Sequence, residues 1–275
     1  MKLLAYLMTS IFLIALSGIL VLLYILWLYG KDLPDYKELS KYNPNVVTRI
    51  HAGNGALLAE YATEKRVFVP INVIPKKLIN AYISAEDKDF YNHFGLDLKA
   101  TLRAVLTNIK NIGSGKRLIG ASTITQQVAK NFLLSSEVSY ERKIKEAILA
   151  IRIERAFSKN QILELYLNEI YLGFKSYGVA AASLNYFDKS LDNLDLAESA
   201  FLAALPKAPN NYNPIHKQMQ AINRRNWVLN QMNRNGYIDD KTKELESLKI
   251  INIRKSTGID EGYAPYFTEE VRKIL

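Results

Sequence analysis

Cysteine is absent from the 275 residues, and glycine and proline are scarce, with 13 and 8 residues. Without cysteine the chain has no disulfide framework, no thiolate metal site and no cysteine nucleophile. The scarcity of glycine and proline, together with a hydrophobic share of 49%, excludes collagen-like repeats and a wholly disordered chain. The sequence therefore predicts a folded protein with a packed core.

Acidic residues are outnumbered by basic ones, 27 against 36, which gives a formal net charge of +9. This balance suits an anionic partner such as nucleic acid, a phosphorylated ligand or a lipid headgroup surface. The basic residues are scattered and no nucleic-acid recognition motif occurs. Nucleic acid is therefore not an expected partner.

Charged residues are also missing between Lys2 and Lys31, where large apolar side chains dominate. A bilayer core needs about 20 such residues in a helix. A cleaved signal peptide is the alternative, but its apolar core has about 7 to 15 residues and ends at a small-residue cleavage site, which we do not find. We expect a retained single-pass anchor, with the N-terminus in the cytoplasm and the body outside it.

The remaining chain divides by composition. Turn residues Gly53-Asn54-Gly55 between two apolar runs predict a small β-hairpin. From Lys76 onward helix signals dominate, including capping boxes that begin at Thr123, Ser158 and Asp195. The predicted segments are a tail and anchor (1–31), a connector with the hairpin (32–75), a helical domain (76–236) and the start of a linker (237–275).

Finer features are predicted within these segments. The glycine-rich basic stretch 111–120 predicts a mobile loop, and 248–253 a possible strand. Two helices are expected to pack one apolar face each on the core. The first stripe is Ile144, Ala147, Ile148 and Ile151, and the second is Ile162, Leu163, Tyr166 and Ile170.

Glu86, Phe90 and His93 have spacings of four and three residues, which would place them on one helical face. A carboxylate half-buried against aromatic rings has a raised pKa, as a general base requires. The structural alternative is a solvated acidic helix end beside a hydrogen-bonded core histidine.

Residues 120–131 place hydroxyl groups and backbone N–H groups at a helix start, where a phosphate is favoured. Lys130 adds a positive charge one turn after Gln126. A well-capped ordinary helix is the alternative.

Arg142, Lys143 and Glu146 form a third cluster, with spacings of four and three residues. The structural alternative is an exposed salt bridge within the helix, which would stabilise the helix by about 0.3 to 0.5 kcal/mol. The functional alternative is that these groups converge on a pyrophosphate, directly or through a divalent metal.

Four motifs occur in order: Glu86-Asp87-x-x-Phe90-x-x-His93-x-Gly95, Gly120-x-Ser122-Thr123-Ile124-Thr125-Gln126-Gln127, Arg142-Lys143-x-x-Glu146 and Ile162-Leu163-Glu164-Leu165-Tyr166-Leu167-Asn168. Together they resemble the peptidoglycan glycosyltransferase (transglycosylase) domain of class A penicillin-binding proteins. The tail 263–267 resembles the linker of the 1A type, and no S-x-x-K acylation motif occurs, so we expect the transpeptidase domain to be missing.

The resemblance implies a mainly α, lysozyme-like helical domain at the bacterial inner membrane that polymerises lipid II into β-1,4 glycan strands. The 4-hydroxyl of one sugar would displace undecaprenyl pyrophosphate from C1 of another with inversion. The implied partners are lipid II, the growing glycan strand, the bilayer and either a separate transpeptidase or other cell-wall synthesis proteins.

The resemblance also implies residue roles. Glu86 would be the base, and Glu146 would orient the cations or hold a Mg²⁺ ion. Pyrophosphate would be held by Lys130, Arg142 and Lys143. The other expected substrate-binding residues are Asp87, Ser122, Thr123, Gln126, Gln127 and Asn131. A glycan-cleaving lysozyme-like enzyme and a catalytically silent membrane scaffold are the alternative functions.

Overall fold

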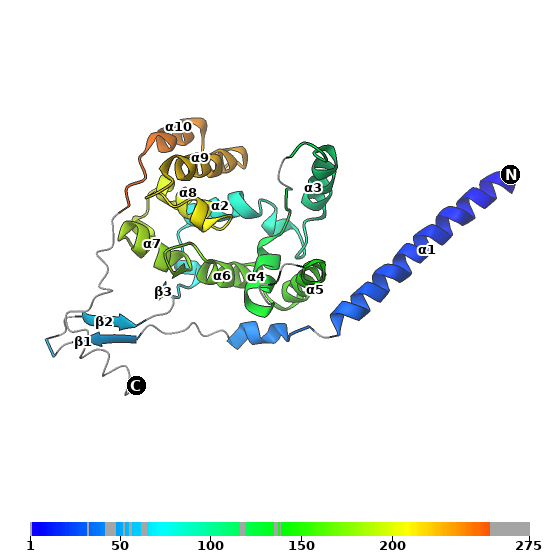
Figure 1. Cartoon of the computed structure of the whole chain (residues 1–275), viewed down its shortest axis with the longest axis horizontal. Helices are drawn as coiled ribbons and strands as arrows, with labels where there is room; N and C mark the ends of the chain where they lie inside the picture. Colours follow the sequence, from blue (N-terminus) through cyan, green and yellow to red (C-terminus); the bar gives the residue numbers. More distant parts are fainter. Residues whose placement is uncertain are drawn as a thin grey trace.

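The structure is a computed structural model that describes residues 2–31, 33–41, 48–51, 53–54, 57–61, 65–115, 119–134, 137 and 139–253. A long N-terminal helix projects from a helical body (Figure 1). The α-helices are α1 (Lys2–Gly30), α2 (Lys76–Glu86), α3 (Leu98–Lys110), α4 (Ile124–Leu133), α5 (Tyr140–Ala156), α6 (Lys159–Glu169), α7 (Val179–Phe187), α8 (Leu196–Ala204), α9 (Gln218–Arg234) and α10 (Asp240–Leu248).

The short strands form two-stranded sheets outside the helical core. The strands are β1 (Thr48–His51), β2 (Leu57–Tyr61), β3 (Lys65–Arg66) and β4 (Ser176–Tyr177). Strands β1 and β2 pair antiparallel across the predicted turn, and β3 pairs with β4 in parallel. The mainly α fold, the N-terminal apolar helix and the hairpin are therefore confirmed.

The core lies where α2 packs against α8 and α9 and where α4 packs against α5 and α6. The three predicted capping boxes are present, with side chains of Thr123, Ser158 and Asp195 accepting from the backbone three residues later. The predicted stripe of α6 is buried, from Ile162 to Ile170. Local sequence thus determines where these helices begin and which face packs.

The predicted stripe of α5 is wrong. Among its members only Ile148 is buried, whereas the buried face is formed by Glu146, Leu149, Ala150 and Ile153. The residues of this face also have helical spacing, but the first of them, Glu146, is charged. An apolar pattern misses the face because Glu146 is buried as an ion-pair partner rather than left in water.

The C-terminal part of the described chain also differs from the prediction. Helix α10 continues to Leu248, and no strand forms over 249–253 within the described residues. The buried Arg225 of α9 instead donates hydrogen bonds to the carbonyl groups of Ser247 (2.8 Å) and Lys249 (2.6 Å). Helix α10 packs against α9 and α8, and the domain boundary at residue 236 stays a prediction. The tail 263–267 lies outside the described residues.

Gly95 is required where the chain passes close to α5. It has φ of +88°, and a Cβ there would lie 2.7 Å from the carbonyl oxygen of Ala150. We expect Gly95→Ala to lower the free energy of unfolding by about 2–4 kcal/mol, because left-handed backbone strain and overpacking add. Denaturant titration of the purified protein measures this change.

Gly113→Ala is the matched control for backbone strain alone. Gly113 has φ of +81°, and among the described residues, its chain neighbours apart, no atom lies within 4 Å of the added Cβ. Its substitution is expected to cost only about 1 kcal/mol. Equal losses for the two variants would show that the contact with α5 contributes nothing.

Candidate active site

Glu86 is the last residue of α2, and the chain leaves the helix at Asp87 with φ of −159° and ψ of 78°. A turn and a short 3-10 helix (Phe90–Asn92) follow. The prediction that Glu86, Phe90 and His93 share one helical face is therefore wrong. Where α2 ends, the Asp87 carboxylate binds groups outside the helix.

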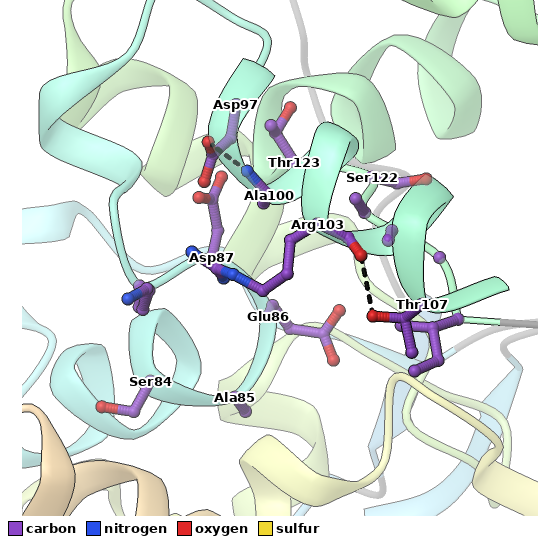
Figure 2. A pocket seen from close by; sticks show the side chains of 15 residues that line it. Ser84, Ala85, Glu86, Asp87, Asp97, Ala100, Arg103, Thr107, Ser122 and Thr123 are labelled. Atoms are coloured by element: carbon purple, nitrogen blue, oxygen red, sulfur yellow. Dashed lines mark hydrogen bonds between the residues drawn. The ribbon is translucent and has the colours of Figure 1, made fainter. Parts of the chain in front are cut away.

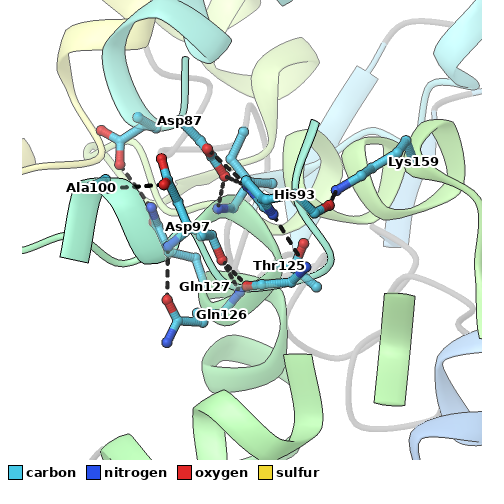
Figure 3. Close-up of polar contacts among 12 residues, drawn as sticks. Asp87, His93, Asp97, Ala100, Thr125, Gln126, Gln127 and Lys159 are labelled. Atoms are coloured by element: carbon cyan, nitrogen blue, oxygen red, sulfur yellow. Dashed lines mark hydrogen bonds and ion pairs between the residues drawn. The ribbon is translucent and has the colours of Figure 1, made fainter. Parts of the chain in front are cut away.

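Asp87 joins the first motif to the start of α4 (Figure 3). Its Oδ2 accepts a hydrogen bond from the backbone N–H of Ile124 at 2.9 Å and lies 2.9 Å from Nε2 of His93. Because Gly95 N–H donates to Nδ1 of His93 at 3.2 Å, the network assigns the imidazole proton to Nε2. Asp87 is buried and fixes the chain that follows Glu86 to His93 and to the start of α4, and its predicted contact with substrate stays a prediction.

Thr123 and Gln126 hold α4 in place. The side chains complete a capping box, in which Thr123 Oγ1 accepts from Gln126 N–H at 3.1 Å and Gln126 Oε1 accepts from Thr123 N–H at 2.9 Å. The Thr123 hydroxyl also donates to the carbonyl of Gly95 at 2.6 Å. Both side chains therefore have structural partners, and their predicted contact with substrate stays a prediction.

Gln127 orients the carboxylate of Glu86. Its Nε2 donates to Glu86 Oε2 at 2.8 Å. Burial raises the pKa of Glu86 above its ordinary value, while the bond from Gln127 and the positive charges of Arg224, Lys207 and Lys130 oppose that rise. The result is a carboxylate with a raised pKa that is still hydrogen-bonded in its charged form.

Glu86 opens onto a pocket of about 260 Å³ between α2, α3 and the loop before α4 (Figure 2). Arg103 and Thr107 of α3 line one side, and Ser122 and Thr123 line another. The pocket is thus walled by the first and second motifs, with α3 covering it.

Positive charge gathers on α5 around a buried carboxylate. Glu146 is 1% exposed, with Oε1 lying 3.1 Å from Nε of Arg142 and Oε2 lying 2.5 Å from Nζ of Lys143. Lys143 Nζ also donates to Ser122 Oγ at 3.1 Å. Glu146 therefore fixes two cations, and one of them reaches the wall of the Glu86 pocket.

Lys130 of α4 is close enough to interact electrostatically with Glu86 and with the charged groups of α5. Burial lowers its pKa, and the charges of Lys143 and Arg142 lower it further, while Glu146 and Glu86 raise it. The structure therefore brings together the predicted base, Gln127, Ser122 and the predicted pyrophosphate ligands. Asn131 is exposed on α4, and in the described part of the chain no hydrogen bond ties it to this cluster.

Comparison with known proteins identifies the family of this chain. Residues 54–233 match the family described as Transglycosylase. The chain belongs to the transglycosylase family. The predicted family is thereby confirmed, and the four motifs with their cluster lie inside the matched residues.

Relatives of this transglycosylase-family chain are much longer. It is 52% identical over 259 residues to penicillin-binding protein 1A of Rickettsia felis, covering 94% of this chain and 33% of that protein. It is 43% identical over 245 residues to penicillin-binding protein 1A of Aquifex aeolicus, covering 89% and 33%. The crystal structure of penicillin-binding protein 1A from Haemophilus influenzae matches with a TM-score of 0.50 and 27% identity, covering 85% of this chain and 24% of that one. The chain thus spans about a third of the curated relatives.

The predicted metal role of Glu146 has an alternative explanation in the ion pairs of this carboxylate. Both carboxylate oxygens already face a cation. Among the described residues, no group of three or more His, Asp or Glu side chains is arranged to hold a metal ion. The use of Mg²⁺ therefore stays an untested prediction, and Glu146 is better explained as the residue that fixes Arg142 and Lys143.

Sequence reasoning missed Arg224 of α9, whose charge acts on the predicted base, Glu86. It is only 9% exposed, and its guanidinium carbon lies 3.8 Å from the ring centroid of Trp227. Its charge lowers the pKa of Glu86, and Lys207 acts in the same direction. No local signal marks Arg224, because the packing of α9 on α2 brings together segments that are distant in sequence.

Proposed function

We propose that this chain is a peptidoglycan glycosyltransferase that polymerises lipid II into β-1,4 glycan strands and releases undecaprenyl pyrophosphate. One observation carries the proposal: a half-buried carboxylate with a raised pKa, Glu86, shares its surroundings with the cations of α4 and α5. A base and an anion site are the two elements that this displacement requires.

In the proposed reaction the 4-hydroxyl oxygen of the acceptor sugar attacks C1 of the donor sugar. Glu86 takes the hydroxyl proton as the new C–O bond forms and the bond from C1 to the pyrophosphate oxygen breaks. Pyrophosphate leaves as an anion, so Lys130, Arg142 and Lys143 stabilise it without a general acid. Attack opposite the leaving group converts an α linkage into a β linkage.

The proposed substrate has a lipid tail in the bilayer, so a membrane anchor would keep the enzyme close to it. Helix α1 contains a stretch, Tyr6–Gly30, that is long and apolar enough to cross a membrane. Helix α3 beside the pocket also presents an outward apolar face, where Leu98, Leu102, Val105 and Ile109 are between 48% and 74% exposed. We propose that both contact the bilayer, with the N-terminus in the cytoplasm and the body outside the bacterial inner membrane.

Polymerisation of purified lipid II by the purified chain tests the proposal. Glycan strands and released polyprenyl pyrophosphate are the expected products, and the separate transpeptidase that the resemblance implies is not needed for them. Cleavage of added glycan without polymerisation would instead indicate the lysozyme-like enzyme. Binding of glycan or cell-wall proteins with neither reaction would indicate the silent scaffold.

Arg224→Met is expected to move the acid limb of the polymerisation rate to higher pH. The positive charge of Arg224 lowers the pKa of Glu86, so its removal raises that pKa and protonates the base at a higher pH. Initial rates measured across pH report the shift. Arg234→Met, an exposed change in the last turn of α9, should leave the acid limb in place. An unchanged acid limb in Arg224→Met would contradict the assignment.

A further inference from the structure

The C-terminal end of the anchor is bonded to the body of the protein. Arg152 of α5 donates from Nη2 to the carbonyl oxygen of Gly30, the last residue of α1, at 3.0 Å. The last four carbonyl groups of a helix have no partner within the helix, and a cation is favoured beside them. The last turn of α1 contains no basic residue of its own, so α5 supplies the cation.

Further contacts make this junction more than a single bond. The C-terminal end of α1 lies beside α5 (Figure 1), and the 3-10 helix Tyr36–Lys41 that follows the anchor packs on α5. Leu39 is 4% exposed, and Leu33 and Tyr36 pack against the core. The described residues after the anchor therefore lie against the body instead of forming a free tether.

The side chains near Gly30 indicate the membrane level of this junction. Tyr24 and Trp27 lie on the last turns of α1, with ring centroids 6.1 Å apart, and Nζ of Lys31 lies 5.5 Å from the Trp27 ring centroid. Aromatic rings beside a lysine at a helix end are typical of the membrane–water interface. Arg152 therefore holds the anchor where the bilayer ends.

The same helix carries the cations proposed to bind pyrophosphate. At about 1.5 Å per residue, Arg142 and Arg152 are roughly 15 Å apart along α5. The pyrophosphate of a lipid-linked sugar is confined to the headgroup layer by its chain. The angle between α1 and α5 therefore determines whether Arg142 and Lys143 reach that layer.

We propose that Arg152 is a positioning residue that locks α5 to the end of the membrane anchor and so sets the cations of α5 at the height of a lipid-borne pyrophosphate. This inference rests on the proposed function. Arg152 touches no reacting atom; it acts through the orientation of the body on the bilayer.

The first test compares two substrates with the full chain in phospholipid vesicles. Arg152→Met is expected to lower the rate at least fivefold on lipid II with its long chain in the bilayer, and less than twofold on a water-soluble analogue with a short prenyl chain. Arg155→Met, an exposed change one turn along α5, should alter neither rate. Equal losses on both substrates, or no loss on either, would overturn the proposal.

The second test measures how firmly α1 is held against α5, and it does not depend on enzyme activity. Because the chain has no cysteine, Leu23→Cys and Glu141→Cys provide unique spin-label positions on α1 and α5. The distance distribution between the labels is expected to be narrow in the parent and at least twice as wide with Arg152→Met. An unchanged width overturns the lock, whereas failure of the parent to polymerise either substrate overturns only the proposed function.

Discussion

Glu86→Gln is expected to reduce the rate of lipid II polymerisation by about 10²–10⁴-fold, the range that general bases contribute. The amide keeps the size of the side chain and occupies the place where Gln127 donates a hydrogen bond to the carboxylate at 2.8 Å. It cannot accept the proton of the sugar hydroxyl group that attacks C1. Initial rates at saturating substrate measure the loss. Binding of lipid II should change little, because the cations of α5 are untouched.

Glu141→Gln is the matched control for the Glu86 variant. Glu141 is a carboxylate of α5 whose side chain is 54% exposed and pairs with Lys145. We expect its rate to stay within twofold of the parent. Circular dichroism and thermal unfolding should show both variants folded. A Glu86→Gln protein that polymerises at the parental rate would remove the base from the mechanism.

The helix starts of this protein were predictable because each depends on a few neighbouring residues. At Thr123 the capping box follows from a hydroxyl and a glutamine three residues apart, and the structure contains both bonds. The order of the four motifs likewise indicated the family before any packing was known. Local hydrogen bonds and short motifs can therefore be predicted from a sequence.

The parts that depended on distant partners were not predictable. Helix α2 stops at Glu86 where Asp87 accepts the N–H of Ile124, a bond between segments far apart in the chain. The buried position of Glu146 depends on its two cations, and the influence of Arg224 on Glu86 depends on how α9 packs. Spacing rules contain none of this information.

Lys130→Met should lower the polymerisation rate by about 10²–10³-fold, comparable to the loss of one preorganised group that stabilises developing charge. Methionine retains most of the apolar stem, so packing of α4 is largely kept while the charge is lost. Initial rates with purified lipid II measure the effect, together with the affinity for inorganic pyrophosphate as a product mimic. Both should weaken, because Lys130 interacts electrostatically with Glu86 and with Arg142, Lys143 and Glu146.

Lys145→Met separates this effect from a general loss of positive charge on the same surface. Lys145 lies on α5 and pairs with Glu141 at 2.7 Å. Its loss should leave the rate within twofold. A lysozyme-like enzyme has no departing pyrophosphate to stabilise, so in that case Lys130→Met would leave glycan cleavage nearly unchanged. The two variants together therefore decide whether the cations beside Glu86 serve a leaving diphosphate or only the fold.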